Sequence, residues 1–498
     1  MKTKKRCHFF KCMIFIALCF VLTVVAAPIA LPEDVYWHMA KKVIYEMPQL
    51  LDNSLDIAAF GGSTCHSFSA MELWNEYGIS AYGFGTGNQP KKASYYLLKE
   101  LLVKQTPSAV LLEVSGTSLE ENFRQVFDTM PFTKAKFDGI IDHTKDEDMD
   151  PVISYLFPVI KYHLNWKRLV KGSFILDDEA YDLVFRGFET KTGAVGVEYL
   201  GITETNADVK ELHEQDYEYI MKIIGLCKEK GIKVVLYTTL NYGWDVAAHN
   251  AIQKIATAER LEYIDFCLSE TMKAAGLNYA SDNIDTVHTN TFGGIKQTRY
   301  LGRILTQNQA FLDKRGNAAY KELDKDSLYY SHWVEVERLQ MENDMKAYLQ
   351  DMINTANGND CTIFFSVKDE GVNAFDDELC QKFSQMGFLS DFDRQKNYRH
   401  SFIGVKNGGS VMYEKMSQGE NNLDDALGFS SYTLDGAQFT VKSAGAECGN
   451  NSSVVIDGKE YSKNERGFNV VVYDNVRHKV VDSVNWDTCA EPGLLGKR

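Results

Sequence analysis

Residues 55–64 read LDIAAFGGST, and this stretch decides the fold. A short apolar run ends in a pair of glycines, and Ser63 follows directly. Runs of this length that stop at glycines are typical of a buried strand that leads into a sharp turn. The sequence therefore predicts a strand over 55–60 that delivers a serine hydroxyl to the edge of a sheet.

The chain downstream alternates between further short apolar runs and amphipathic segments. Four more runs predict strands over 79–84, 108–114, 232–239 and 261–266. The intervening segments have the apolar spacing of helices, over 69–76, 91–105, 216–230 and 245–260. Five strands with helices between them imply an α/β fold, with a parallel sheet, flanking helices and right-handed crossovers. Ligands of such sheets bind at the carboxyl ends of the strands, so the chemistry is expected there.

Changes of composition divide the 498-residue chain further. Residues 118–212 break the alternation and predict an insertion on the carboxyl face of the sheet, either a lid or an acceptor-binding surface. From residue 361 onward, short β-like runs separated by Gly, Asn and Asp predict a mostly β module. The expected parts are a basic tip with a membrane anchor, a large α/β domain, a polar linker helix with a hinge, and the β module, over 1–31, 32–328, 329–360 and 361–498.

The N-terminus predicts attachment to a membrane. Five positive charges precede an uncharged apolar run over 13–27, and they are Lys2, Lys4, Lys5, Arg6 and Lys11. A cleaved signal peptide and an uncleaved single-pass anchor both fit this pattern. The anchor is favoured because cleavage after Ala27 would leave Pro28 at the first mature position. The positive-inside rule then predicts a single-pass cell-membrane protein whose large α/β domain is extracellular.

Overall charge and cysteine spacing exclude several classes. A net charge of −15 argues against a nucleic-acid partner bound through phosphate contacts. No CxxC motif or His/Cys spacing indicates zinc, so neither a metal nor another cofactor is expected. The last four cysteines leave room for one or two disulfides outside the cell, and they are Cys361, Cys380, Cys448 and Cys489.

Two motifs could complete a site around Ser63. A glycine-rich loop follows the second predicted strand, and the amides of Gly85, Gly87 and Ser63, with the side chain of Asn88, could bind a developing oxyanion. Far downstream, residues 285–290 read DTVHTN. An Asp three residues before a His can accept a hydrogen bond from Nδ1 and hold the tautomer whose Nε2 removes a serine proton.

Each motif alone has a simpler explanation, as a turn, a connection or a surface pair. Together they favour catalysis, because all three follow strands and would meet at one edge of one sheet. The interpretation makes Ser63 the nucleophile, His288 the general base and Asp285 the acid that orients it. Cys65 and His66 flank the nucleophile and are interpreted as packing residues.

This combination resembles the SGNH/GDSL hydrolase superfamily, and more closely its DltD-like and alginate O-acetyltransferase-like membrane-anchored branch. The stretches LWNEYGISAYGFGTGNQP, SYLFPVIKYHLNWKRL and VHTNTFGGIKQTRYLG also carry the resemblance, which covers roughly residues 55–309. The chain departs from the family where Gly62 and Thr64 flank the serine without the usual acid. It also has EVSG at 113–116 in place of the Gly-x-Asn-Asp block. One oxyanion donor is therefore unassigned, and Asn241 is a spare candidate.

The last segment has a resemblance of its own. Residues 465–488 read ERGFNVVVYDNVRHKVVDSVNWDT and resemble the interleukin-like EMT inducer domain. That domain also forms the stem of a glycosyltransferase, where it binds sugar, so the resemblance implies carbohydrate binding. Trp486 and Asp487 could contact a sugar, although core packing is the favoured role for the tryptophan.

The resemblances imply extracellular, serine-dependent acyl transfer. The leading hypothesis is O-acetylation of a cell-surface or secreted polysaccharide, with a membrane-bound O-acyltransferase as the acyl supplier. Two alternatives stay open, namely an esterase that removes acetyl groups from surface glycans and a non-catalytic adaptor of a glycan-modifying membrane complex. An imidazole base predicts that activity falls as the ring becomes protonated in mildly acidic solution.

Overall fold

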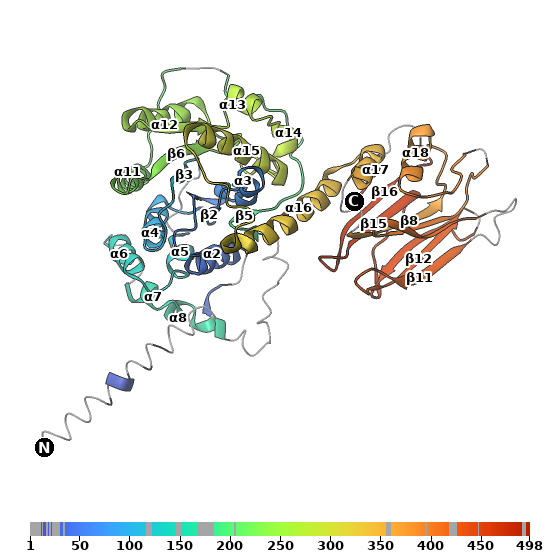
Figure 1. Ribbon diagram of the computed structural model, residues 1–498, viewed down its shortest axis with the longest axis horizontal. Coiled ribbons are helices and arrows are strands. Elements are labelled where there is room, and N and C mark those ends of the chain that lie inside the picture. Colours follow the sequence, from blue (N-terminus) through green and yellow to red (C-terminus); the bar gives the residue numbers. More distant parts are fainter. Residues whose placement is uncertain are drawn as a thin grey trace, which may run out of the picture. The chain divides into compact units, whose positions relative to one another are not determined.

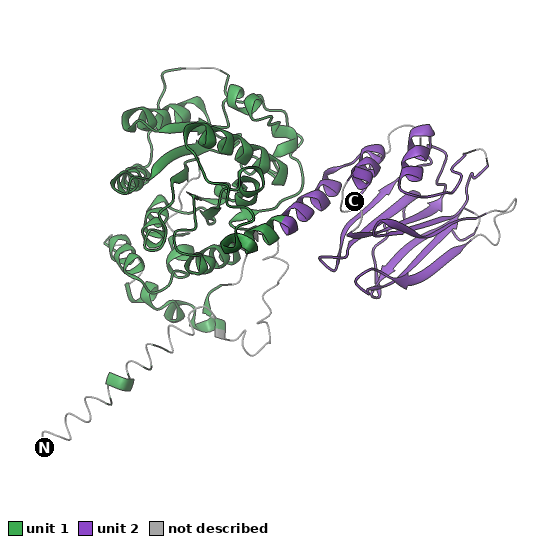
Figure 2. Ribbon diagram, in the orientation of Figure 1, with its two compact units in different colours: residues 1–327 green, residues 328–498 purple. Residues whose placement is uncertain are grey.

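The computed structural model describes most of the chain, namely residues 11, 13–15, 18, 21, 30–32, 35–115, 122–145, 152–166, 184–203, 206–354, 360–394, 396–417, 426–446, 448–490 and 495–498. The chain forms two compact units, 1–327 and 328–498 (Figure 2). The predicted anchor, 1–31, lies outside the described residues apart from a few positions. In the described part of the chain, no helix has both the length and the apolar character needed to cross a bilayer.

The first unit is built on a parallel five-stranded sheet, which confirms the predicted α/β class (Figure 1). Its strands are β1 (Ile57–Gly61), β2 (Ala81–Gly85), β3 (Ala109–Glu113), β6 (Lys233–Thr238) and β7 (Glu262–Asp265), in the order β2-β1-β3-β6-β7. The chain moves from β1 outward to β2 and then returns past β1 to β3. The connection after β1 runs to β2, and the connection after β3 runs the other way to β6, so a binding crevice is expected between the carboxyl ends of β1 and β3.

Alternate residues of β1 face two separate cores. Ala58 and Phe60 pack into one, and Ile57 and Ala59 pack into the other. The helices that contribute to the first core are α2 (Val35–Glu46), α4 (Lys91–Leu101), α11 (Glu214–Glu229) and α12 (Val246–Glu259). Those that contribute to the second are α3 (Ala70–Tyr77), α13 (Ser269–Ala274), α14 (Tyr279–Asp282) and α15 (Thr291–Asn308). Apolar layers on both faces hold the sheet rigid beneath the crevice.

Capping residues set where these helices begin and end. Ser69 caps α3 by accepting a hydrogen bond from the Glu72 amide, and the helix stops at Gly78, whose φ of 68° suits a glycine. Helix α15 begins at Thr291. The Asn290 side chain accepts from the Gly293 amide at 2.9 Å and starts the helix directly after the histidine motif.

The first part of the predicted insertion at 118–212 is packed into the core of the first unit and does not form a lid. Its described elements are α5 (Phe123–Phe127), α6 (Lys134–His143), α7 (Val152–Leu156), α8 (Pro158–Lys161), η4 (His163–Trp166), β4 (Val184–Phe185) and β5 (Phe188–Glu189). Phe123, Val126 and Phe127 are fully buried in the core that also contains α4. Aromatic burial therefore makes α5 and α6 an extension of the hydrophobic core.

The second unit contains a nine-stranded, mostly antiparallel sheet, as the β-like runs predict. Its strands are β8 (Cys361–Asp369), β9 (Phe402–Asn407), β10 (Ser410–Met416), β11 (Leu427–Tyr432), β12 (Gln438–Gly445), β13 (Asn451–Ile456), β14 (Lys459–Glu460), β15 (Gly467–Asp474) and β16 (Lys479–Trp486). Its helices include α17 (Met345–Asn354) and α18 (Asp377–Gln385), and α16 (Lys321–Met341) precedes them.

The segment 329–360, predicted as a polar linker helix with a hinge, contains most of helix α16 and all of α17, and both contribute to the core of the second unit. Val336, Leu339, Tyr348 and Leu349 are buried in the same core as the sheet of the second unit. They recur at helical spacing, so α16 and α17 present an apolar face that the polar residues between them conceal in the sequence.

Trp486 has the packing role that the sequence favours. It is fully buried, its ring lies 4.7 Å from that of Tyr348, and its Nε1 donates to the Asn343 carbonyl at 3.1 Å. Asp487 forms an ion pair with Arg466 at 2.7 Å. The described cysteines, at 65, 227, 267, 361, 380, 448 and 489, are all free thiols, so no disulfide forms among them.

Candidate active site

The nucleophile candidate begins a tight turn at the carboxyl end of β1. Gly62 is extended, and residues Ser63–Ser67 form a short 3₁₀ helix, η2, in which the Cys65 amide donates to the Gly62 carbonyl at 3.0 Å. Gly61 is required by close approach, because a Cβ there would lie 2.6 Å from Glu113 Cβ on the neighbouring strand. The glycine pair therefore lets the chain turn sharply against β3 and leaves Ser63 at the crevice.

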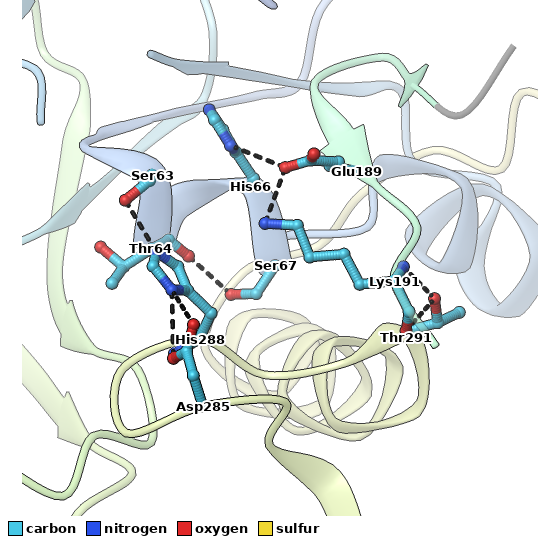
Figure 3. Close-up of polar contacts among 9 residues, drawn as sticks. All are labelled: Ser63, Thr64, His66, Ser67, Glu189, Lys191, Asp285, His288 and Thr291. Atoms are coloured by element: carbon cyan, nitrogen blue, oxygen red, sulfur yellow. Dashed lines mark hydrogen bonds and ion pairs between the residues drawn. The ribbon is translucent and has the colours of Figure 1, made fainter. Parts of the chain in front are cut away.

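The structure brings Ser63, His288 and Asp285 together (Figure 3). Ser63 Oγ lies 2.9 Å from His288 Nε2, although the two residues are 225 positions apart in sequence. On the other side of the ring, His288 Nδ1 lies 2.9 Å from Asp285 Oδ2. Hydroxyl, imidazole and carboxylate thus form one continuous hydrogen-bonded chain, the arrangement that activates a serine for nucleophilic attack.

Hydrogen bonds keep the Asp285 carboxylate ionised. Burial tends to raise the pKa of Asp285, but the backbone amides of Val287 and His288 and the His288 imidazole outweigh it, so that pKa lies below its usual value. Both amides donate to Oδ1 at 2.7 Å, which leaves Oδ2 for the imidazole. An ionised Asp285 favours the tautomer with a proton on Nδ1, and its Nε2 can then accept the serine proton.

The loop that carries His288 is closed on itself. The Ile284 amide donates to the His288 carbonyl at 3.0 Å, and Asn283 pairs with Thr289 in an antiparallel bridge. Asn283 Nδ2 also donates to the Leu240 carbonyl, after β6, at 3.0 Å. These contacts tie the loop to the carboxyl edge of the sheet, where Ser63 also lies.

The four predicted oxyanion donors occupy different positions. The backbone of Asn88, at a φ of 43°, lies beside the nucleophile turn, since a Cβ at Gly62 would be 3.7 Å from Asn88 Cα. Gly87 is buried next to it. Gly85 pairs with Gly61 in the strand ladder, and a Cβ there would lie 2.9 Å from the Gly62 carbonyl oxygen. The glycine at 85 therefore serves close packing, and the Ser63 and Gly87 amides and Asn88 remain the candidate donors.

The spare candidate Asn241 and the flanking Cys65 have structural roles. Asn241 is buried, and its Oδ1 accepts from the Gly243 amide at 2.8 Å. Cys65 is fully buried, and burial raises the pKa of its thiol to about 12, so it stays protonated and unreactive. Within the described part of the chain, no group of His, Cys, Asp and Glu side chains could hold a metal ion.

A buried carboxylate beneath the nucleophile turn was not predicted. Glu113, at the end of β3, is fully buried, and its Oε2 accepts from Thr64 Oγ1 at 2.7 Å. Its Oε1 accepts from the Ser115 amide at 2.9 Å, and buried Lys91 donates to its carbonyl at 2.9 Å. A buried carboxylate is costly unless it is hydrogen-bonded, and the Thr64 hydroxyl and the Ser115 amide supply those bonds, whereas Lys91 binds the backbone carbonyl. The one available signal was a single acid at the end of an otherwise apolar strand.

The bond from Thr64 to Glu113 predicts an order of stability. Thr64→Val keeps the shape of the side chain but leaves Glu113 short of a donor, so the free energy of unfolding should fall by about 1–3 kcal/mol. Thr64→Ser keeps the hydroxyl and loses one methyl group, at a cost of about 1 kcal/mol. Urea unfolding of both variants measures the difference. A serine variant less stable than the valine variant would contradict the role of the hydroxyl.

Comparison with solved structures finds nine similar chains, and two of them come from Bacteroides species. No protein-family model and no curated protein matches the sequence. The chain is similar to a candidate acylhydrolase of Bacteroides fragilis NCTC 9343, at 11% identity and a TM-score of 0.28, over 54% of this chain and 95% of that one. It is similar to a GDSL-like lipase of Bacteroides thetaiotaomicron VPI-5482, at 10% identity and a TM-score of 0.26, over 54% and 98%. TM-scores this low support no conclusion about function. The function is therefore inferred from the geometry of the site.

Proposed function

We propose that this protein catalyses acyl transfer through a covalent acyl-serine intermediate on Ser63. The observation that carries the proposal is the distance of 2.9 Å between Ser63 Oγ and His288 Nε2, with Asp285 bonded to the other ring nitrogen. A serine that donates to a neutral imidazole held by a carboxylate is suited to attack an acyl carbonyl at neutral pH.

The reaction proceeds in two half-reactions. Ser63 Oγ attacks the acyl carbonyl while His288 Nε2 takes its proton, and the oxygen of the tetrahedral intermediate is stabilised by the Ser63 and Gly87 amides and the Asn88 side chain. His288 then returns the proton to the departing group. In the second half, the same nitrogen deprotonates the acceptor hydroxyl, which attacks the acyl-serine and restores the free enzyme.

The proposed acceptor is a carbohydrate hydroxyl, and the proposed acyl group is acetyl. This choice is supported by the sequence resemblance to polysaccharide O-acetyltransferases and by three tyrosines beside the triad. The rings of Tyr199, Tyr242 and Tyr279 lie 5.3–5.9 Å apart, and the Tyr242 amide donates to the Thr286 carbonyl at 2.9 Å. The ring of Tyr242 is exposed and suits the apolar face of a sugar. In this proposal the basic, apolar N-terminus would hold the enzyme on the outer face of the membrane, beside an acyl supplier.

Hydrolysis is the second candidate, and solvent access favours it. The side chain of His288 is 27% exposed and that of Asp285 is 50% exposed. Water can therefore reach the general base and take the place of the sugar hydroxyl. The chain would then be a carbohydrate esterase with the same acyl-serine intermediate.

A product ratio distinguishes the candidates. The protein is incubated with a chromogenic acetyl ester, with and without a neutral oligosaccharide, and acetylated sugar and free acetate are measured by mass spectrometry and enzymatic assay. A transferase gives acetylated sugar faster than acetate, and an esterase gives acetate alone. A serine-directed phosphonate should label Ser63 in both cases. Absence of both labelling and turnover would overturn the catalytic proposal and favour an adaptor.

A further inference from the structure

A short segment of the insertion is fastened to the edge of the parallel sheet. We call residues 186–191 the strap. The Gly83 amide of edge strand β2 donates to the Arg186 carbonyl at 2.9 Å, and Arg186 Nε donates to the Ala81 carbonyl at 2.8 Å. A Cβ at Gly187, whose φ is 87°, would lie 1.9 Å from the Gly83 carbonyl oxygen. The strap therefore starts from a fixed point on the sheet.

The middle of the strap holds the turn that carries Ser63. Glu189 Oε2 lies 3.2 Å from His66 Nδ1 and 2.8 Å from Lys191 Nζ, and Figure 3 shows the carboxylate in contact with both the imidazole and the ammonium group. Burial tends to raise the pKa of Glu189, but the bonds and charges of His66 and Lys191 lower it to about 2. The carboxylate is thus ionised at neutral pH and accepts a hydrogen bond from Nδ1 of buried His66, three residues after the nucleophile.

The end of the strap holds the helix that follows His288. The Lys191 amide donates to Thr291 Oγ1 at 2.8 Å, and the Thr291 amide donates to the Lys191 carbonyl at 2.9 Å. Thr291 is the first residue of α15. One turn later, a Cβ at Gly294 would lie 2.6 Å from the Ser67 carbonyl oxygen and 2.9 Å from the ring of Phe188. The nucleophile turn, the strap and α15 therefore meet without space between them.

We propose that Glu189 is a positioning residue for acyl transfer, because the strap ties the turn of Ser63 to the helix start behind His288. The inference rests on the proposed function of the same site. Ser63 and His288 come from segments far apart in the chain, and their alignment depends on what joins those segments. A displacement of about 1 Å between reacting groups can lower a rate about 10²-fold. The strap limits that displacement from the side of the insertion.

Truncation of Glu189 tests this role. Glu189→Ala should lower kcat for a small acetyl ester by about tenfold and change KM less than about twofold, because the variant loosens alignment and leaves the substrate pocket intact. The rate of phosphonate labelling of Ser63 should fall by the same factor. Glu189→Gln keeps an acceptor oxygen for His66 and should recover part of the loss. Glu262→Ala is the matched control, since Glu262 pairs with Lys233 at 3.0 Å at the opposite end of the strands and should keep the wild-type kcat.

Substitutions at Glu189 and at Thr291 should have non-additive effects on kcat, because both residues hold the same strap. Thr291→Val removes the hydroxyl that accepts from Lys191, and Thr291→Ser keeps it. If one loose end already frees the strap, Glu189→Ala and Thr291→Val together should lower kcat by clearly less than the product of the single losses. If Glu189→Ala does not fold, the two Thr291 variants test the proposal instead. A lower kcat in Thr291→Val than in Thr291→Ser would support the role of the strap.

Several outcomes would overturn the role of the strap. One is a Glu189→Ala variant with the wild-type kcat and labelling rate. Another is a double variant whose loss of kcat equals the product of the two single losses. A third is an equal kcat in Thr291→Val and Thr291→Ser. These outcomes leave Ser63 reactive in the wild-type protein. Failure of the proposed function is separate, because wild-type Ser63 itself would then resist the phosphonate.

Discussion

Replacement of Ser63 by alanine is expected to lower acyl turnover by about 10⁴-fold or more, to the level that binding and oxyanion contacts alone provide. The variant removes the atom that forms the covalent intermediate, and His288 then has no hydroxyl to activate. The measurement is kcat/KM for an acetyl ester, together with mass-spectrometric detection of the acyl-enzyme. Both the turnover and the acylated peptide should be lost.

Ser67→Ala is the matched control for this variant. Ser67 lies on the same turn, and its hydroxyl donates to the Thr64 carbonyl at 2.8 Å, whereas Ser63 Oγ faces His288. The control should keep turnover within a few-fold of the wild type. Activity retained in Ser63→Ala would contradict the triad, and equal losses in both variants would mean that the turn, and not its first hydroxyl, is what matters.

The sheet and the triad could be predicted because both depend on local patterns. Each strand of the parallel sheet is a short apolar run, and the turn after β1 and the Asp285–His288 spacing are visible within a few residues. Parallel topology then places everything that follows a strand at one edge. The spatial convergence of Ser63 and His288 follows from topology, with no need to know the side-chain packing.

The supporting carboxylates Glu113 and Glu189 could not be predicted, because their roles depend on contacts between distant parts of the chain and not on local patterns. Glu189 meets His66 across 123 positions, from a two-residue strand in an insertion without a regular pattern. Glu113 ends an apolar strand, and its carboxylate meets the Thr64 hydroxyl only after folding brings the two strand ends together. Burial and partnership of a single acid are tertiary properties, and spacing in the sequence does not encode them.

The apolar face of α16 and α17 was missed because charged residues interrupt it in the sequence. Val336, Leu339 and Leu349 face the sheet of the second unit, while their polar neighbours are more exposed. A helix with a narrow apolar stripe has the overall composition of a linker, and only its periodicity separates the two.

Asp285→Asn is expected to lower kcat about 10³-fold without loss of fold, because it imposes the wrong histidine tautomer. In the wild type, Oδ1 accepts from the Val287 and His288 amides, and Oδ2 accepts from the imidazole. An asparagine must keep its oxygen toward the two amides, so its NH₂ group faces Nδ1. That nitrogen must then accept, the ring proton moves to Nε2, and Nε2 can no longer take the proton of Ser63.

The tautomer itself provides a readout besides activity. Nitrogen NMR of His288 should show the ring proton on Nε2 in the variant and on Nδ1 in the wild type. The Asp285 side chain is 50% exposed, so water can partly replace it. The expected loss of kcat in Asp285→Asn is therefore smaller than the loss of about 10⁴-fold for a buried triad aspartate. Asp313→Asn is the control, since Asp313 is 53% exposed and also accepts from a backbone amide, that of Arg315. Wild-type turnover with an unchanged tautomer in Asp285→Asn would show that the carboxylate does not orient the base, and the acyl-transfer geometry would lose its third member.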